Sequence, residues 1–236
     1  MLLIESRHVA TQTGAIHVKV GGERSPISSP IVDVNVDRIR EAIEGGVSIL
    51  QIRVSTRELV VAAAITQKLD RARSRLLMFY RMIDIPSSSG AAAPSFGVGT
   101  HLPDNPPPGF SQVTSIQAMR SRPDGESQLI SKAVHSLDAA LQAERDGADM
   151  LIFGTVFPSS SHPEAPAAGL DALREISAAA AIPVIAIGGI TAHNAGDCIA
   201  AGAAGVAVIS AIHDAPDPRE AAAKLRAAIG PLTPDH

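Results

Sequence analysis

Continuous apolar runs alternate with amphipathic stretches along the second half of the chain. The apolar runs cover residues 149–157, 183–189 and 205–212. The amphipathic stretches, which carry apolar residues at helical spacing, cover residues 170–181, 191–202 and 218–230. Strands covered on both faces lack the in–out alternation of half-exposed strands. The pattern therefore predicts a parallel sheet with helices packed against it.

The first half repeats this rhythm less regularly. It predicts strands at residues 47–53, 75–81, 96–102 and 127–135, and helices at residues 37–46, 56–74 and 136–147. The first strand is either 2–6 or 31–36, and we favour 2–6. The alternation predicts an α/β fold, a (β/α)8 TIM barrel built as a single domain over residues 1–236. Ser136 and Thr191 are expected as helix N-caps, and Gly202 as a C-terminal cap.

Several segments interrupt the alternation. Residues 8–36 are expected to be an insertion or an N-terminal arm. Flexible loops are predicted at 86–95, which is a low-complexity run, and at 158–168, which is rich in serine and proline. The prolines of 103–109 exclude a helix or strand there. Because the alternation resumes after each interruption, none of them is interpreted as a domain boundary.

Composition and charge narrow the functional classes. The formal net charge of −4 gives no basic surface for nucleic acid. The single cysteine, Cys198, lies among apolar residues of a predicted helix, so we expect inert core and a reducing compartment. No apolar run reaches the roughly 20 residues of a membrane span, and the N-terminus has no basic leader. We therefore expect a cytoplasmic protein with no membrane partner.

Motifs for common cofactors are also absent from the sequence. No Walker motif and no strand followed by G-x-G-x-x-G is present, which leaves ATP and dinucleotides unsupported. No Cys/His pair has zinc spacing, and no two adjacent carboxylates end a predicted strand. The sequence therefore predicts no metal site.

The active site of such a barrel lies at the carboxyl ends of the strands. Gly188 and Gly189 end one predicted strand and precede a helix, which leaves their N–H groups open to an anion such as phosphate. Ile209 and Ser210, at the end of the last strand, complete the predicted phosphate site. The alternative interpretation is that the paired glycines only permit a tight turn.

Other strand ends carry candidate catalytic and substrate-binding residues. His135 is the candidate general acid or base, the alternative being a partly exposed histidine at a strand–helix junction. Arg53 is suited to clamp a carboxylate or phosphate by two parallel hydrogen bonds, unless it forms a salt bridge among the loops. The remaining substrate-binding candidates are Gln51, His101, Gly154, Ser160 and Ser161.

Three segments resemble a known family. "GADMLIFGTVFPSSSHPEAPAAGLDALREI" and "IPVIAIGGITAHNAGDCIAAGAAGVAVISAI" resemble the thiamine phosphate synthase and thiazole tautomerase superfamily, and "GGVSILQIR" with "STREL" resembles it at the second strand. The resemblance implies one of two activities. The synthase joins a pyrimidine pyrophosphate to a thiazole phosphate and needs Mg²⁺. The tautomerase aromatises a thiazole carboxylate phosphate by proton transfer without a metal.

The chain departs from the synthase pattern at three places. Ser55 stands where that pattern has a basic residue, and Phe79 and Tyr80 stand where it has Asn-Asp, whose Asp binds Mg²⁺. Pro103 and Asp104 replace its Gly-Gln. These changes remove groups that would neutralise a departing pyrophosphate.

The segment "AVHSLDAALQAE" resembles the tautomerase branch, in which the matching histidine is the acid/base. The resemblance therefore implies an isomerase without cofactors, in which His135 moves the proton, Arg53 holds the carboxylate and the predicted phosphate site holds a thiazole phosphate. The loop 158–168 would be the lid over the thiazole. The alternatives are a divergent synthase, which would need Mg²⁺, and a catalytically silent phosphate-binding relative. The alanine-rich outer helices offer surfaces where a homodimer could pack.

Overall fold

The fold is an eight-stranded sheet in which every neighbouring pair of strands is parallel and the strands follow one another in chain order. The computed structural model describes residues 2–5, 36–54, 77–82, 99–104, 116–121, 129–159 and 166–230, with only the backbone described at 2–5, 36, 52–54 and 77–82. The strands are β1 Leu2–Glu5, β2 Ile49–Val54, β3 Leu77–Met82, β4 Gly99–Leu102, β5 Leu129–Val134, β6 Met150–Phe153, β7 Val184–Ile187 and β8 Gly205–Ala207.

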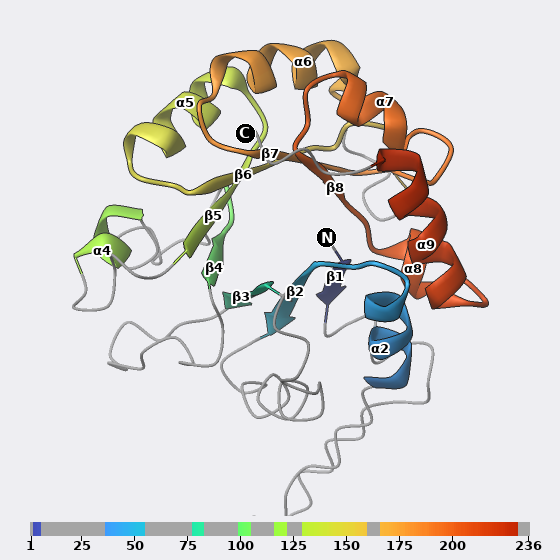
Figure 1. Ribbon diagram of the computed structural model, residues 1–236. Helices are drawn as coiled ribbons and strands as arrows, with labels where there is room; N and C mark the ends of the chain where they lie inside the picture. The colour runs from blue at the N-terminus through green and yellow to red at the C-terminus, as the bar shows by residue number, and fades with distance from the viewer. Residues whose placement is uncertain are drawn as a thin grey trace, which may run out of the picture.

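Helices cover the outer, convex side of the curved sheet (Figure 1). They are α2 Val36–Glu44, α4 Ile116–Arg120, α5 Leu137–Arg145, α6 Gly169–Ala179, α7 Ala195–Ala200, α8 Ser210–His213 and α9 Pro218–Ile229. Ser136 caps α5, because its side chain accepts a hydrogen bond from the N–H of Ala139. Gly202 ends α7 with φ +99° and donates its N–H to Ile199 O. Both caps confirm the sequence prediction.

Alternation along each strand divides the apolar side chains between two faces of the sheet. Outward residues such as Leu151 and Phe153 belong to the main core, which they share with buried helix residues such as Leu173 and Ile176. A second cluster on the inner face contains Met150, Ile152, Ile185 and Ala207, with Ile49, Leu129 and Ile187 packed against it. Because both faces are covered, the strands read as continuous apolar runs.

The structure resolves the open choice for the first strand. Leu2–Glu5 forms β1 and pairs with β2, as favoured above, and α2 already begins at Val36. The segment from 6 to 35, which contains most of the predicted insertion, lies outside the described residues, as do the predicted helix 56–74 and the predicted loop 86–95.

Two predictions about element boundaries are wrong, and one short helix was not predicted. The strand predicted at 205–212 ends at Ala207 and gives way to α8, because the apolar run continues from strand residues into the buried helix residue Ile212. Thr191 is not an N-cap, since α7 begins at Ala195, after a turn. The short helix α4 was not predicted, since five residues carry too little periodicity to be recognised.

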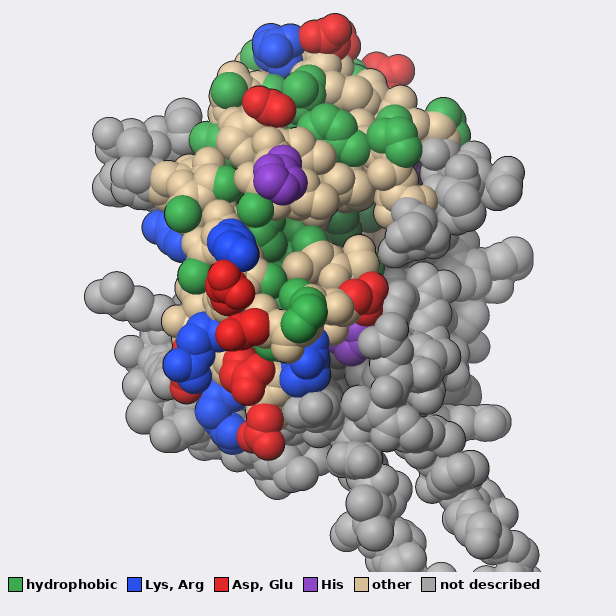
Figure 2. All heavy atoms as spheres, turned by 90° about the vertical axis from the view of Figure 1, so that its right-hand side faces the viewer, with side chains coloured by type: hydrophobic (Ala, Val, Ile, Leu, Met, Phe, Trp, Pro, Cys, Tyr) green, Lys and Arg blue, Asp and Glu red, His purple; other side chains and the backbone are tan. Residues whose placement is uncertain are grey.

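Helices α2 and α9 pack together beside the first and last strands. Arg38 of α2 donates to the carbonyl oxygens of His213, at 2.9 Å, and Ala215, at 2.5 Å. Glu44 of α2 forms an ion pair with Arg219 of α9. Figure 2 shows this side of the molecule, where acidic and basic side chains intermingle over its lower part without a patch of one charge. Among the described residues, no helix is long and apolar enough to cross a membrane.

Candidate active site

Three buried polar side chains lie above the inner apolar cluster. His101 and Ser131 face each other in the β4–β5 register, and His101 Nδ1 lies 2.9 Å from Ser131 Oγ. Their exposed fractions are 4% and 0%. Gln51 is 1% exposed, and its buried Oε1 has no hydrogen-bond partner among the described residues. Since a buried acceptor without a partner is costly, Gln51 has the character of a ligand-binding group.

Ser131 was not among the site residues predicted from the sequence. Counting back from His135 in steps of two places Ser131 on the same face of β5, which is the pattern that could have identified it. His101 lies at the carboxyl end of β4, as the sequence predicted, and it is buried there beside Ser131.

His135 lies at the carboxyl end of β5, where the sequence analysis placed it, and it is exposed. Its Nδ1 forms a hydrogen bond with the carbonyl oxygen of Gly154, at the end of the neighbouring strand β6. A carbonyl only accepts, so Nδ1 carries the proton, and in the neutral ring Nε2 is the basic nitrogen. This arrangement suits a group that takes up or releases a proton at Nε2.

The loop after β6 packs closely on the end of β7; we call residues 154–159 the β6 loop. A Cβ on Gly154 would overlap the carbonyl oxygen of Ile187. A Cβ on Gly188 would lie 2.5 Å from Thr155 Cγ2, and one on Gly189 would lie 2.8 Å from Phe157 Cβ. Gly154, predicted from the sequence as a substrate-binding residue, therefore has a packing reason for lacking a side chain.

Gly188 and Gly189 adopt φ values of +101° and +63°, which side-chain-bearing residues rarely adopt. The β6 loop fixes this turn, because the N–H of Val156 donates to Ile187 O at 2.9 Å and the N–H of Phe157 donates to Gly188 O at 3.1 Å. Outside helices and strands of the described chain, no backbone hydrogen bond uses the N–H of either glycine. Contacts with the β6 loop therefore fix the Gly188–Gly189 turn, and the N–H groups of the two glycines are candidate donors for a ligand.

Ile209 and Ser210 follow the neighbouring strand β8. Ser210 was predicted to end the last strand, but it is exposed and begins α8. Ile209 and Ser210 therefore belong to the connection from β8 to α8. Because β7 and β8 are adjacent and parallel, this connection and the Gly188–Gly189 turn lie at the same end of the sheet.

Several candidates lie where the structure describes little or nothing. Arg53 pairs with Glu5 of β1 and Arg81 of β3 in the backbone register, and its side chain lies outside the described part. Ser160 and Ser161 lie outside the described residues, together with most of the predicted lid 158–168.

The remaining chemistry-bearing side chains of the described chain do not form a further site. No group of three or more His, Cys, Asp or Glu residues that could hold a metal ion occurs among the described residues. Cys198 is fully buried, and burial, with a smaller contribution from Asp197, raises the pKa of its thiol from 9.0 to about 11. This confirms it as an inert core residue.

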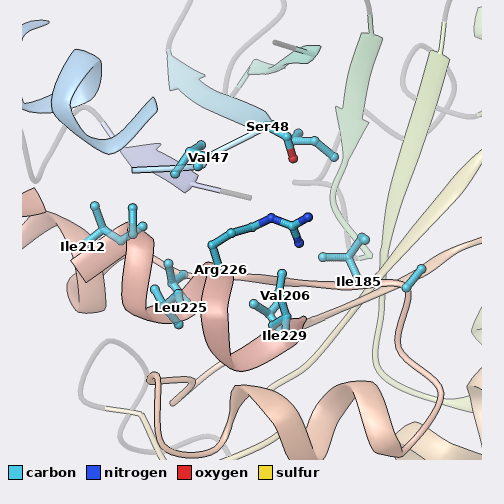
Figure 3. A pocket seen from close by; sticks show the side chains of 14 residues that line it. Val47, Ser48, Ile185, Val206, Ile212, Leu225, Arg226 and Ile229 are labelled. Atoms are coloured by element: carbon cyan, nitrogen blue, oxygen red, sulfur yellow. The ribbon is translucent and has the colours of Figure 1, made fainter. Parts of the chain in front are cut away.

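A cavity of about 160 Å³ lies at the opposite end of the sheet, near the amino-terminal ends of β2, β7 and β8. Apolar side chains such as Val47, Ile185 and Leu225 line it, and the guanidinium of Arg226 extends across it (Figure 3). Arg226 Nη1 also donates to Gly230 O at 2.7 Å. The cavity is remote from the strand ends that carry His135 and the glycine turn.

Comparison with known sequences connects these features to one family. A sequence profile described as thiamine monophosphate synthase matches residues 25–212. A thiamine-phosphate synthase of Pyrococcus furiosus is 34% identical over 194 residues, covering 81% of this chain and 86% of the relative. A thiamine-phosphate synthase of Chlorobium luteolum is 37% identical over 210 residues, covering 86% and 92%.

Two solved structures have a similar fold. A thiamine phosphate pyrophosphorylase from Pyrococcus furiosus superposes with a TM-score of 0.68 at 28% identity, covering 97% of this chain and 94% of that one. A 3-hexulose-6-phosphate synthase superposes with a TM-score of 0.62 at 18% identity, covering 83% and 93%. The second likeness shows a shared fold alone.

Proposed function

The chain belongs to the thiamine monophosphate synthase family, and from this premise we propose that it joins a pyrimidine pyrophosphate to a thiazole phosphate to form thiamine phosphate. The observation that carries the proposal is the identity of 34% and 37% to relatives named thiamine-phosphate synthase, over more than four fifths of both chains. These relatives favour the transferase over the tautomerase expected from the motifs. We also propose that the eight strands close into a (β/α)8 barrel.

The thiazole phosphate would bind at the ends of β7 and β8. The N–H groups of Gly188 and Gly189, for which no backbone hydrogen bond is found outside the described helices and strands, support this assignment, as do the positive φ values of the turn and the adjacent Ile209–Ser210 connection. Backbone donors in a concave turn bind anions well, because their dipoles are fixed before the ligand arrives. Phosphate sites of barrel enzymes commonly occupy the loops after the seventh and eighth strands.

The rest of the substrate would lie over the inner face, between the glycine turn and the polar group of Gln51, His101 and Ser131. Gln51 Oε1 is an unpartnered acceptor and suits a donor on the substrate, such as an exocyclic amine. During coupling, the thiazole nitrogen forms a bond to the pyrimidine methylene carbon, the bond from that carbon to pyrophosphate breaks, and pyrophosphate leaves with the negative charge. Arg53 is the proposed cation for that charge.

Magnesium would supply further charge neutralisation in a synthase, but the described residues do not fit it. Asp104 is the carboxylate that follows β4, and a lone carboxylate is a weak magnesium ligand set. The ammonium of Lys132 already lies 3.2 Å from Asp104 O and 2.5 Å from Pro103 O, which adds a positive charge there.

A thiazole tautomerase is the second candidate, and the geometry of His135 favours it. The hydrogen bond of Nδ1 to Gly154 O leaves Nε2 as a base beside the proposed thiazole pocket. Phe79 and Tyr80 in place of Asn-Asp agree with a reaction that needs no metal. A proton shift asks only for a phosphate anchor and a group that moves the proton.

Two assays on the purified chain separate these functions. The first supplies thiazole phosphate, pyrimidine pyrophosphate and Mg²⁺ and measures thiamine phosphate; the second follows aromatisation of the thiazole carboxylate phosphate by its ultraviolet spectrum. Thiamine phosphate formation supports the synthase. Aromatisation lost in His135→Ala, without thiamine phosphate formation, supports the tautomerase. Phosphate binding with neither activity identifies a silent relative and contradicts both.

A further inference from the structure

We propose that Asn194 is a positioning residue that holds the Gly188–Gly189 turn in its phosphate-binding conformation; the inference rests on the proposed function. Asn194 Nδ2 donates to Gly189 O at 3.1 Å, and Asn194 Oδ1 accepts the N–H of Thr191 at 2.7 Å. One side-chain amide therefore engages the backbone on both sides of Ile190. No other described side chain contacts Gly189 O through a hydrogen bond.

Three successive carbonyl oxygens at this turn accept hydrogen bonds, and Asn194 donates to the last of them. The β6 loop holds the carbonyl oxygens of Ile187 and Gly188, and Asn194 holds that of Gly189. In a trans peptide the N–H points away from the carbonyl oxygen that precedes it. The N–H groups of Gly188, Gly189 and Ile190 are therefore directed away from these partners. Three successive donors are fixed, two by the β6 loop and the third by Asn194.

The turn needs such a restraint because both of its central residues are glycines. Glycine has the widest conformational freedom of any residue, so a free glycine pair would lose much entropy when a phosphate ordered it. A side chain that fixes the turn beforehand lowers this cost and raises affinity. Asn194 itself is anchored: its N–H and that of Ala195 donate to Thr191 O at 3.3 and 3.0 Å, and Ala195 is fully buried.

Only a carboxamide supplies both interactions, since it has two donors and an acceptor on one short side chain. Asn194→Asp keeps the acceptor for the N–H of Thr191 but places a second acceptor against Gly189 O and adds a negative charge near the phosphate. Asn194→Ala removes both hydrogen bonds without adding charge. The two variants therefore differ in charge and share the loss of the Gly189 contact.

The test measures binding of inorganic phosphate to the full chain by calorimetry, together with the amide NMR signals of Gly188 and Gly189. We expect phosphate to shift both signals in the unmodified protein, about a threefold to tenfold weaker affinity for Asn194→Ala, and a larger loss for Asn194→Asp. His193→Ala is the matched control. It removes an exposed neighbouring side chain and keeps the backbone hydrogen bonds, so its affinity should stay within about twofold.

The outcomes separate this inference from the proposed function. If phosphate leaves the glycine signals of the unmodified protein unmoved, the proposed phosphate site is wrong. If phosphate binds there and both Asn194 variants bind it as well as His193→Ala does, the positioning role is wrong. If a variant fails to fold, hydrogen exchange on the unmodified protein provides the test instead. Phosphate should slow exchange of the Asn194 side-chain amide, and an unchanged rate overturns the inference.

Discussion

Gly188 shows why this site depends on residues that have no side chain. Its φ of +101° is strained for other residues, and a Cβ there would press on Thr155. We expect Gly188→Ala to lower the free energy of unfolding by about 1–3 kcal/mol for the backbone conformation, with a similar further loss from the clash. Urea denaturation measures the loss.

Gly169 provides the comparison for that measurement. It has φ +82°, and no atom of the described part of the chain lies within 4 Å of a Cβ placed there. Gly169→Ala should therefore show only the backbone cost. Equal losses for the two variants would mean that the β6 loop does not pack on the turn as described.

Because of Cys198, we expect the free energy of unfolding to decrease as the solution becomes alkaline. Its pKa is raised to about 11 in the folded protein from an ordinary 9.0, mainly by burial. The unfolded chain therefore releases this proton first, and the contribution of the thiol to stability, complete below pH 9, is lost as pH rises toward 11. Denaturation of the unmodified protein and of Cys198→Ala between pH 8 and 11 measures it. Parallel pH profiles for the two proteins would contradict the assignment.

At the residue scale, the sequence could predict the positions of candidate residues along the strands but not the contacts around them. His135 and the two glycines are at strand ends, as the alternation of elements predicts. The requirement for glycine at position 154 comes from its contact with Ile187 of β7, and His101 pairs with Ser131 of β5. Both contacts join strands that are distant in sequence. Periodicity within one segment contains no information about such contacts.

Among the elements, α9 offers the clearest test of a local signal. Asp217 caps it by accepting the N–H of Glu220 at 2.9 Å, and Pro218 occupies the first turn. We expect Asp217→Ala to reduce the free energy of unfolding by about 1 kcal/mol. Asp217→Asn keeps the acceptor and should be close to neutral. Equal losses for the two substitutions, measured by chemical denaturation, would rule out the cap.

Element boundaries could be predicted from sequence where caps are present and failed where tertiary contacts decide. The helix predicted at 218–230 is found at Pro218–Ile229, because proline and glycine define its ends. The helix predicted from Thr191 starts at Ala195, because the Thr191–Asn194 hydrogen bonds form a turn instead. β8 is shorter than predicted, since apolar periodicity does not separate a strand from the buried start of α8.

At the scale of the molecule, Arg38 joins the first described helix to the last part of the chain. It donates to two carbonyls after β8, whereas Glu44 and Arg219 form a mostly exposed ion pair. Arg38→Met removes both of these hydrogen bonds, and we expect a loss of about 1–3 kcal/mol in the free energy of unfolding. Glu44→Gln should cost less than about 1 kcal/mol. Urea denaturation of both variants tests this order, and a larger loss for Glu44→Gln would reverse it.

The whole fold was the most predictable level, because continuous apolar strands alternating with helices have few arrangements other than a parallel sheet. The reaction was less predictable. Motifs near His135 resemble the tautomerase, while the full-length relatives are named synthases. The substrates of both reactions share a thiazole phosphate, so both proposed functions depend on the position of its binding site.

The most direct test is a crystal structure of the chain with bound thiazole phosphate. We expect the phosphate at the N–H groups of Gly188 and Gly189, beside Ile209 and Ser210, with the thiazole ring close to Nε2 of His135. Density for the ligand at the opposite end of the sheet, in the cavity beside Arg226, would contradict the proposed phosphate site.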